Sequence, residues 1–270
     1  MKKKIGLTGS TGSLGKTILK KNKKFVFKLF KDDIRDRKKV FKWVDKNNLE
    51  VVIHLAAVVP IKEVKKNPSK AKSINFIGTK NLVDACIKKR ISWFFFASTS
   101  HVYKSSNKKI TEASIKKPIS YYGKTKLLAE QYIIKKFESA KIKYCIGRIF
   151  STTNKNQKKN YLVPDLKYKI KNAKKKILLR NLNHYRDFIS MDDISKIIFI
   201  LLKKRFNGIL NFGSGNGIFL KDIAKIIAKK YKKKIIFNDN KKITYLVANI
   251  SKLLRYYKFK KSKKIENLIF

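Results

Sequence analysis

The sequence predicts an α/β protein with a doubly wound parallel sheet and a small C-terminal lobe. Short apolar runs alternate with amphipathic stretches over residues 3–150, the pattern of strands joined by crossover helices. A glycine-spaced loop follows the first apolar run and opens the first amphipathic stretch, as in nucleotide-binding strand–loop–helix units. The 270 residues suffice for one large α/β domain, or a domain plus a lobe, with a substantial core.

The expected elements follow from the period of the apolar residues. Strands are expected where short runs are rich in β-branched or aromatic residues, over 3–9, 24–30, 51–57, 92–98 and 143–150. Helices are expected where apolar residues recur at helical spacing, over 13–22, 37–48, 68–89 and 121–137. The alternation of strand-like and helix-like segments becomes less regular after the lysine-rich stretch at 151–160. We therefore expect one domain over 1–150 and a smaller lobe over 151–270. Strand candidates at about 184–213 are expected to return to the main body.

The formal net charge of +51 suggests a nucleic-acid partner. However, only 8 of the 68 basic residues are Arg, whereas readout of phosphates and bases favours the bidentate guanidinium. The lysines also occur in nearly every segment rather than in one stripe or tail. The charge is therefore interpreted as a compositional bias, and no specific nucleic-acid binding is expected.

The remaining composition predicts a reduced, cytoplasmic protein. Cys86 and Cys145 lie far apart, and the 3 histidines are scattered, so neither a disulfide framework nor a metal cluster is expected. The opening "MKKKIGLTGS" lacks the apolar core of a signal peptide. The longest aliphatic run, "KIIFILL" at 196–202, is too short to span a bilayer, so no membrane insertion is expected.

The loop "TGSTGSLG" at 8–15 predicts that the first domain binds a dinucleotide. Gly9 permits a tight turn, Gly12 lets the backbone approach a pyrophosphate, and Gly15 allows close packing of the helix. The free N–H groups and the dipole of the helix N-terminus favour an anion. The expected cofactor contacts in this loop are Gly9, Thr11, Gly12, Ser13, Leu14 and Gly15.

The spacing GxxGxxG resembles that of the extended short-chain dehydrogenase/reductase family, whose members are nucleotide-sugar epimerases, dehydratases and reductases on a Rossmann-like fold. "DIRD" at 33–36 resembles its adenine-side motif, and "HLAA" at 54–57 resembles its fourth-strand motif behind the cofactor. "INFIGTKNL" at 74–82 resembles its N-x-x-G-T helix. The resemblance implies NAD or NADP as cofactor, with further contacts at Asp33, Ile34, Leu55, Ala56, Ala57, Asn75, Ser98 and Phe150.

One departure from the family concerns the cofactor type. Only 17 residues separate Gly15 from Asp33, so the region between the second and third strands is compressed. Two neighbouring residues could contact the 2′ group of the ribose. Lys31 would favour a 2′-phosphate, whereas Asp32 would favour a free hydroxyl. The choice between NAD and NADP stays open at this point.

Four tyrosines have a lysine four residues later: Tyr122, Tyr132, Tyr256 and Tyr257. With 12 Tyr and 60 Lys in the chain, about three such pairs are expected by chance, so spacing alone decides nothing. Only Tyr122 starts a helix shortly after an apolar strand, in "PISYYGKTK", which resembles the family pattern P-x-S-x-Y-G-x-[ST]-K.

The resemblance implies that Tyr122 is the acid/base and that Lys126 is its partner. The i, i+4 spacing puts both on one helix face, and a neighbouring ammonium favours the tyrosinate. Both are also expected to contact the cofactor. Thr99 is the third catalytic candidate, because it ends a strand where it can hydrogen-bond the substrate oxygen, and Ser98 is the alternative. Ser100 is expected to contact the substrate with Thr99.

The second half of the chain adds a substrate residue. "HYRDFISMDDI" at 184–194 resembles a family segment in which Arg186 would hold the pyrophosphate of the nucleotide sugar bidentately. "GRIFSTTN" at 147–154 departs from the family pattern R-x-x-N-x-[YF]-G-P, because Ser151 replaces the Asn.

The resemblance implies an NAD(P)-dependent enzyme that acts on a nucleotide sugar. Dehydration is not expected, because Ser100 and His101 follow Thr99 where family dehydratases carry Asp-Glu. Epimerisation and 4-keto reduction both remain. The alternatives are a nucleic-acid-binding or regulatory protein that reuses the fold and a catalytically idle cofactor sensor. The family also implies a homodimer through the helices at 68–89 and 121–137.

Overall fold

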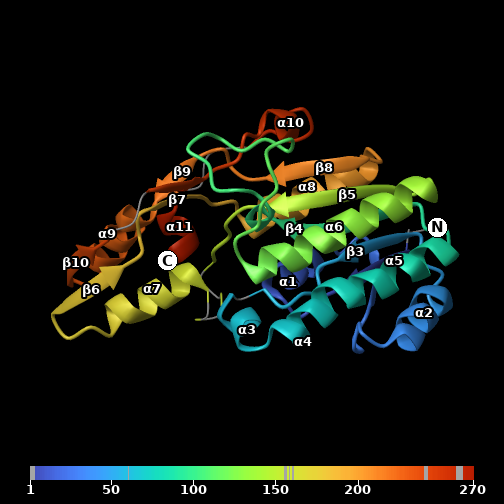
Figure 1. Cartoon of the computed structure of the whole chain (residues 1–270), viewed down its shortest axis with the longest axis horizontal. Helices are drawn as coiled ribbons and strands as arrows, with labels where there is room; N and C mark the ends of the chain where they lie inside the picture. Colours follow the sequence, from blue (N-terminus) through green and yellow to red (C-terminus); the bar gives the residue numbers. More distant parts are fainter. Residues whose placement is uncertain are drawn as a thin grey trace. The chain divides into compact units, whose positions relative to one another are not determined.

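The short apolar runs form a six-stranded sheet (Figure 1). Its order is β2-β1-β3-β4-β5-β8, and neighbours such as β1 with β3 and β3 with β4 pair in parallel. The strands are β1 (Lys4–Thr8), β2 (Val26–Leu29), β3 (Val51–His54), β4 (Trp93–Thr99), β5 (Lys143–Ile149) and β8 (Gly208–Phe212). The doubly wound α/β class predicted from the sequence is confirmed.

The structure is a computed structural model that describes residues 4–59, 61–154, 157, 159, 161–239, 243–259 and 264–270. The chain divides into two compact units. Unit 1 comprises Met1–Lys104, Ile115–Arg148 and Asp192–Leu210. Unit 2 comprises Ser105–Ser114, Ile149–Met191 and Asn211–Phe270.

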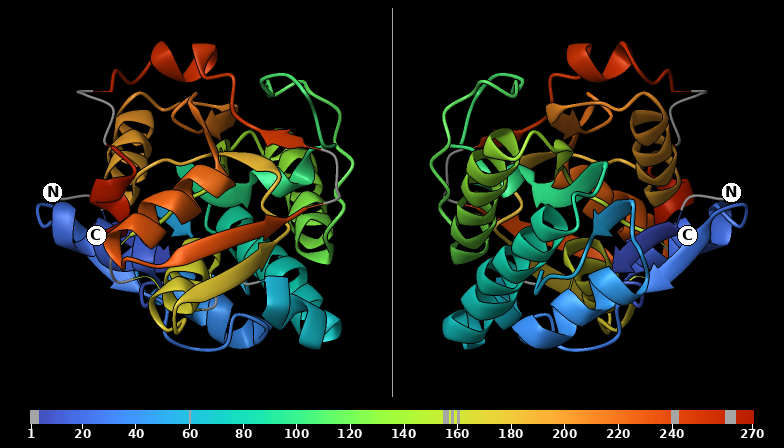
Figure 2. Two further views of the ribbon diagram at one scale, coloured as in Figure 1. Left: turned by 90° about the vertical axis from the view of Figure 1, so that its left-hand side faces the viewer. Right: turned by 90° about the vertical axis from the view of Figure 1, so that its right-hand side faces the viewer.

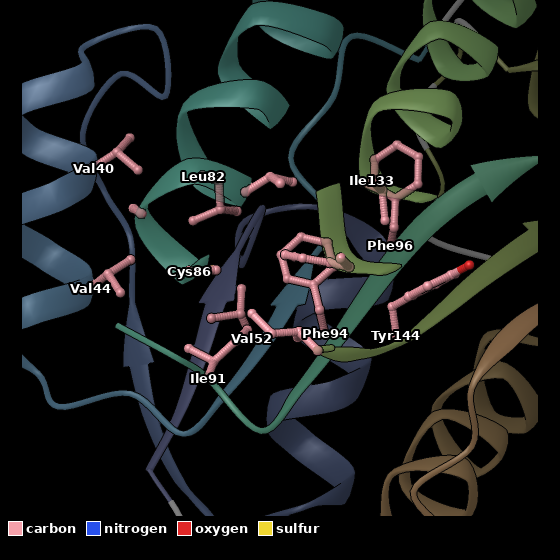
Figure 3. Close-up of a cluster of buried hydrophobic side chains, with 14 of the residues drawn as sticks. Val40, Val44, Val52, Leu82, Cys86, Ile91, Phe94, Phe96, Ile133 and Tyr144 are labelled. Atoms are coloured by element: carbon pink, nitrogen blue, oxygen red, sulfur yellow. The ribbon is translucent and has the colours of Figure 1, made fainter. Parts of the chain in front are cut away.

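Helices cover the sheet of unit 1 because their apolar faces need burial. α2 (Arg37–Lys46), α5 (Thr79–Lys88) and α6 (Tyr121–Ser139) pack on one face, and α5 and α6 run side by side there (Figure 2, right). In Figure 3, apolar side chains of these helices meet those of β3 and β4. The labelled core residues are Val40, Val44, Val52, Leu82, Cys86, Ile91, Phe94, Phe96, Ile133 and Tyr144.

The opposite face receives the other side chains of the same strands. Phe95 alternates with Phe94 and Phe96 and therefore points away from them. α1 (Ser13–Lys21) and α8 (Met191–Lys203) complete unit 1. Asn22, the residue that follows α1, donates to Ser195 Oγ of α8 (3.0 Å).

The helix expected over 68–89 contains a π-helical turn. After the short α3 (Ile61–Lys66), the chain forms α4 (Pro68–Lys72), a π-helical turn (Ser73–Gly78) and then α5. The π-helical turn contains Asn75, which the sequence placed at the cofactor, and such turns are frequent at functional sites.

Unit 2 contains two small sheets and four helices among its described residues. β6 (Lys176–Arg180) pairs in parallel with β10 (Lys234–Asn238) (Figure 2, left). β7 (His184–Asp187) lies between β9 (Gly217–Phe219) and β11 (Thr244–Leu246). The helices are α7 (Leu162–Lys171), α9 (Leu220–Lys230), α10 (Ser251–Leu254) and α11 (Glu266–Ile269).

The observed division differs from the expected boundaries in two places. Residues 105–114 belong to unit 2, because Ile110 exchanges backbone hydrogen bonds with Val247 and Asn249. Within 184–213, α8 from Asp192 onward and part of β8 belong to unit 1, whereas β7 pairs inside unit 2. Strand propensity predicted β7 as a strand but not which sheet would accept it.

Candidate active site

The loops after β1, β3 and β4 meet at one edge of the sheet. Since neighbouring parallel strands end on the same side, the glycine loop, "HLAA" and Thr99 come together there. The order β2-β1-β3 also places the topological switch point between β1 and β3, where open α/β sheets bind ligands. The candidate site therefore lies within unit 1.

Gly9 and Gly15 are required by the fold of the glycine loop. Gly9 has φ +71°, and a Cβ there would lie 2.7 Å from the backbone nitrogen of Ala56. A Cβ on Gly15 would overlap the carbonyl oxygen of Gly9. The loop therefore lies directly against residues 55–56 and against the start of α1.

Gly12 has no such structural requirement. Its φ of −72° suits any residue, and a Cβ there would meet only the Gly9 carbonyl oxygen, at an ordinary 3.4 Å. The residue is exposed at the N-terminus of α1, next to exposed Thr11 and half-buried Ser13 and Leu14. The space beside Gly12 fits close approach of a ligand to the backbone.

A chain of buried hydrogen bonds runs from the end of β1 through His54. Thr79 Oγ1 donates to the Asn75 carbonyl (2.8 Å), so it accepts from Nε2–H of His54 (2.9 Å). The Nδ1 atom of the neutral ring then accepts from Thr8 Oγ1 (2.7 Å). Burial lowers the pKa of His54 well below its ordinary value, and the charge of Lys126 lowers it further. His54 is thus a neutral link between the glycine-loop strand and the π-helical turn.

The Asn75 side chain continues this chain of hydrogen bonds to α6. Its amide accepts from the Val58 N–H (2.8 Å) and donates to the Val58 carbonyl (3.0 Å). It also donates to Thr125 Oγ1 (3.2 Å), whose hydroxyl donates to the Tyr122 carbonyl (2.8 Å). Asn75 therefore fixes the start of α6 against the half-buried segment 55–59.

α6 begins beside the end of β4. Ser120 caps it by accepting from the Gly123 N–H (3.1 Å), and a Cβ on Gly123 would overlap the carbonyl oxygen of His101. This close approach brings the rings of His101 and Tyr122 to 6.2 Å between centroids. Tyr122 is buried, with 7% of its surface exposed.

Lys126, one turn after Tyr122, is a buried lysine. Its side chain is 2% exposed, and Nζ lies 3.9 Å from the centroid of the Phe96 ring. Burial lowers the pKa of Lys126 to about 7, and the carboxylate of Glu130 opposes that shift. Burying a charge without compensation is unfavourable for folding, so Lys126 is the kind of residue that function retains.

Lys126→Met is expected to stabilise the protein. The pKa falls from 10.5 in the unfolded chain to about 7 in the fold. Below pH 7, Lys126 is protonated in both the folded and the unfolded chain, so folding carries the full free-energy cost of burying the charge. The native state therefore gains stability as pH rises between these values. We expect the variant to be more stable by about 1–4 kcal/mol near neutral pH, as when other buried ions are replaced by apolar groups.

Denaturant unfolding curves at several pH values give the free energy of unfolding of both proteins and check this expectation. The gain should shrink as pH approaches 10.5, the unfolded pKa. Lys124→Met is the matched control, because Lys124 is exposed on the same helix, and its replacement should change stability little. Equal effects of the two substitutions would contradict the buried charge.

Thr99 ends β4 with its side chain 5% exposed. Its Oγ1 accepts from the His101 N–H (3.2 Å), so its own proton can be donated to a substrate oxygen. Ser98, predicted as a cofactor contact, donates its hydroxyl proton to Glu130. Ser100 is 2% exposed, in the 3-10 turn Ser100–Val102. Thr99 thus keeps a hydrogen available where Ser98 does not.

The predicted adenine end follows β2, the edge strand of the sheet. Asp33 is exposed and accepts from Arg35 Nε (2.9 Å), which lowers the pKa of Asp33 to about 2. Ile34 is buried against Gly78, with Asn81 donating to its carbonyl (3.3 Å). Asp32 pairs with Lys39 (3.3 Å). Both carboxylates at this end therefore have a cationic partner.

Phe150 and Arg186 belong to unit 2. Phe150 is buried, and its N–H donates to the Phe212 carbonyl (2.9 Å). Arg186 donates to the Tyr185 carbonyl (2.8 Å) and to Thr244 Oγ1 (3.3 Å). No described carboxylate forms an ion pair with it, and burial lowers its pKa to about 10. This guanidinium is suited to an external anion.

Sequence reasoning assigned no role to Asp187, Glu130 or Arg148, which are all buried. Asp187 accepts from Ser214 N (2.7 Å), Gly215 N (2.9 Å) and Ala248 N (3.1 Å), which fixes the turn after β8. Burial raises the pKa of Asp187, and these hydrogen bonds oppose that shift. Glu130 lies four residues after Lys126, a helical spacing that could have identified it.

No group of three or more His, Cys, Asp or Glu among the described residues could hold a metal ion. No helix in the described ranges is long and apolar enough to cross a membrane.

Comparison with known proteins identifies relatives over most of the chain. Residues 5–213 match the profile of the NAD dependent epimerase/dehydratase family. The GDP-6-deoxy-D-talose 4-dehydrogenase of Aggregatibacter actinomycetemcomitans is 27% identical over 268 residues, which cover 93% of this chain and 90% of that protein. The dTDP-D-glucose 4,6-dehydratase of Dictyostelium discoideum is 27% identical over 218 residues, 76% of this chain. Those residues span only 50% of that relative's length.

Solved structures show the same fold. The UDP-glucose 4-epimerase of Thermus thermophilus in complex with NAD superposes with a TM-score of 0.82 at 19% identity, covering 93% of this chain and 92% of that one. RMD from Pseudomonas aeruginosa complexed with NADPH superposes with a TM-score of 0.87 at 19% identity, covering 98% and 96%.

Proposed function

The chain belongs to the NAD dependent epimerase/dehydratase family, and we propose that it is an NAD(P)-dependent oxidoreductase that acts on a nucleotide sugar. The observation that carries the proposal is the buried Lys126, one turn from Tyr122 on α6, a helix that packs against β4, the strand that ends at Thr99. A binding protein would not need a lysine charge kept inside the core beside a tyrosine.

The residues of unit 1 fit a dinucleotide cofactor. The space at Gly12 leaves the backbone open to a pyrophosphate, and buried Lys126 can donate to ribose hydroxyls. The glycine loop, segment 55–57, Asn75 and Lys126 would hold the cofactor. When bound, NAD or NADP supplies the hydride acceptor or donor.

The protein groups move protons and fix the substrate oxygen. Tyr122 exchanges a proton with the sugar hydroxyl or carbonyl, as a general acid or base does. The charge of Lys126 favours the tyrosinate. Thr99 donates to the same substrate oxygen, with its Oγ1 oriented by the His101 N–H. Ser100 follows Thr99 and is proposed to contact the substrate.

We propose that unit 1 binds the cofactor and unit 2 the nucleotide sugar, with Arg186 on its pyrophosphate. Arg186→Met should then raise the KM for a nucleotide sugar about 10- to 100-fold, the value of a hydrogen bond between charged groups. Stability should not fall, because a half-buried cation with no carboxylate partner among the described residues is removed. Steady-state kinetics check this expectation. Arg180→Met, an exposed position of the same unit, is the control and should leave KM unchanged.

Of the two activities that the family implies, we propose 4-keto reduction. A reductase must exchange its cofactor in each cycle, whereas an epimerase returns the hydride to the same molecule. β2 is the edge strand and leads directly to Asp33. Only 17 residues separate Gly15 from Asp33, so little chain is available to enclose an adenosine there, which favours an exchangeable cofactor.

The test supplies a 4-keto nucleotide sugar with NADH or NADPH and follows the absorbance of reduced nicotinamide. Loss of one reduced cofactor per product supports the reductase. Interconversion of two sugar epimers without added cofactor would establish the epimerase in its place. A protein that does neither, and that binds neither nicotinamide cofactor, would overturn the proposed function.

We also propose a cytoplasmic homodimer without specific nucleic-acid binding. Exposed Ile77 on the π-helical turn and Leu128 on α6 support an interface on this side of unit 1. Light scattering would determine the oligomeric state. Any binding to nucleic acid should be weak, strongly salt-dependent and indifferent to sequence, the behaviour of counterion release without base readout.

A further inference from the structure

Two lysine-rich turns of unit 2 lie side by side. One joins α7 to β6, and the other joins α9 to β10. β6 and β10 pair in parallel with Lys176 opposite Lys234, so both turns lie at the same end of this small sheet (Figure 2, left). The Lys234 N–H donates to the Lys175 carbonyl (3.0 Å), and Nζ of Lys233 donates to the Lys174 carbonyl (2.9 Å). Strand pairing therefore joins two distant stretches of the chain into one surface.

The two turns carry eight exposed lysines, which we call the lysine patch. These are Lys171, Lys174, Lys175, Lys176, Lys229, Lys230, Lys232 and Lys234. No Asp or Glu occurs in residues 166–186 or 223–238. The ion pairs described on α7 and α9 use other lysines, namely Lys169, Lys221 and Lys225. The patch is thus a concentrated positive charge that no carboxylate of these two segments compensates.

A general bias toward lysine does not account for the patch. Lys makes up 60 of the 270 residues of the chain, but 9 of the 12 residues in 171–176 and 229–234. Such a bias raises the number of lysines everywhere, whereas the register of β6 and β10 decides that these two stretches meet. Like charges gathered in this way repel one another and lower stability. An anionic partner would remove that repulsion.

The outer face of the same sheet adds an exposed apolar pair. The inner face packs with α7 and α9 in the core of unit 2, through side chains such as Leu179. On the outer face, Leu178 and Ile236 are cross-strand neighbours and are 47% and 39% exposed. Lys176 and Lys234 point to this outer face too, because they lie two residues before the apolar pair and side chains alternate along a strand. The apolar pair therefore borders the lysine patch.

Lysines beside exposed aliphatic side chains fit an anionic lipid surface. Each lysine near such a surface is attracted as a point charge, and aliphatic side chains enter the headgroup boundary. A nucleic acid would instead favour arginines and exposed aromatic rings. Residues 171–180 and 229–238 contain a single arginine, Arg180. The aromatic side chains there, Tyr231 and Phe237, pack against the core.

We propose that the lysine patch, together with Leu178 and Ile236, attaches the protein peripherally to membranes that contain anionic lipid. The attachment is electrostatic and reversible, and the protein lies on the bilayer surface without inserting a helix. The proposal goes beyond the proposed function and does not depend on it, because it uses no residue of the candidate active site.

Co-sedimentation with lipid vesicles tests the proposal on the whole chain. One set of vesicles contains phosphatidylcholine alone, and the other contains phosphatidylcholine mixed with phosphatidylglycerol. The wild type should bind the mixed vesicles and not the neutral ones. Its affinity should fall as salt is added, because ions screen exposed charges.

A pair of matched variants separates the patch from the net charge of the chain. The patch variant neutralises part of the lysine patch through Lys174→Gln, Lys175→Gln, Lys232→Gln and Lys234→Gln. The control variant makes the same charge change at exposed positions of unit 1 through Lys42→Gln, Lys46→Gln, Lys135→Gln and Lys143→Gln. We expect the patch variant to bind mixed vesicles more than about 10-fold less tightly. The control variant should bind like the wild type.

The apolar pair is tested by Leu178→Ser/Ile236→Ser. This variant keeps every lysine, and we expect its affinity for mixed vesicles to fall by about 10-fold through the lost apolar contact. Thermal melts verify that all variants are folded, as expected for substitutions at exposed positions.

Equal losses in the patch and control variants would overturn the proposal, because net charge would then drive the association. Failure of the wild type to bind mixed vesicles would also overturn it. A third contrary result is binding to duplex RNA or DNA that the patch variant loses while its vesicle binding stays unchanged. That result would assign the patch to nucleic acid.

Discussion

Tyr122→Phe is expected to reduce turnover by about 10²- to 10⁴-fold, the usual contribution of a positioned general acid or base. The substitution removes one hydroxyl and keeps the buried ring and its packing near His101. Fold and cofactor affinity should therefore remain. Steady-state kinetics give the loss in kcat, and calorimetry with NADH and NADPH checks that cofactor binding is retained.

Tyr132→Phe is the matched control, since Tyr132 lies on the same helix and also precedes a lysine by four residues. Its hydroxyl donates to Asp84 (2.6 Å), and burial together with this hydrogen bond raises its pKa to about 12. We expect a loss of about 1 kcal/mol in stability from the lost hydrogen bond and wild-type turnover. Comparable losses of activity in both variants would show that Tyr122 is not the acid/base.

Gly12→Val is expected to abolish cofactor binding in a folded protein. The backbone at Gly12 tolerates a side chain, and within the protein a Cβ there meets only the Gly9 carbonyl oxygen at 3.4 Å. A valine would instead fill the space through which a pyrophosphate reaches the N–H groups of α1. Calorimetry with NADH and NADPH measures the binding, and thermal melts verify the fold.

Gly15→Val separates the two kinds of glycine in this loop. A Cβ on Gly15 would overlap the Gly9 carbonyl oxygen, so this variant should lose stability whether or not a cofactor binds. Unchanged affinity of Gly12→Val for both cofactors would exclude the loop from the cofactor site.

Much of unit 1 could be predicted from the sequence, because its signals are local. Strand and helix periods depend on neighbours two to four residues away, and they located β1, β3, β4 and β5 correctly. The glycine loop and the Tyr122–Lys126 pair are also short-range patterns. The choice of Tyr122 among four tyrosines used its neighbours in the chain, and that assignment remains a prediction.

Longer-range features were decided by tertiary structure. Glu130 and Arg148 are 18 residues apart, and Thr8 and His54 are 46 apart, so no spacing rule joins them. The π-helical turn was read as plain helix, and its Asn75 accepts a hydrogen bond from Val58 on another segment.

The hydrogen-bond partner of Ser98 and the pairing partners of β7 were also decided by tertiary structure. The sequence placed Ser98 beside Thr99 as a further cofactor contact, which stays a prediction, and the packing of α6 directs its hydroxyl proton to Glu130. The strand at β7 was expected, but its partners β9 and β11 come from segments about 30 and 60 residues away. The sequence by itself determined the strands, the loop and the candidate pair. The tertiary structure decided which buried charges and hydroxyls face one another, because burial brings together groups that the chain keeps far apart.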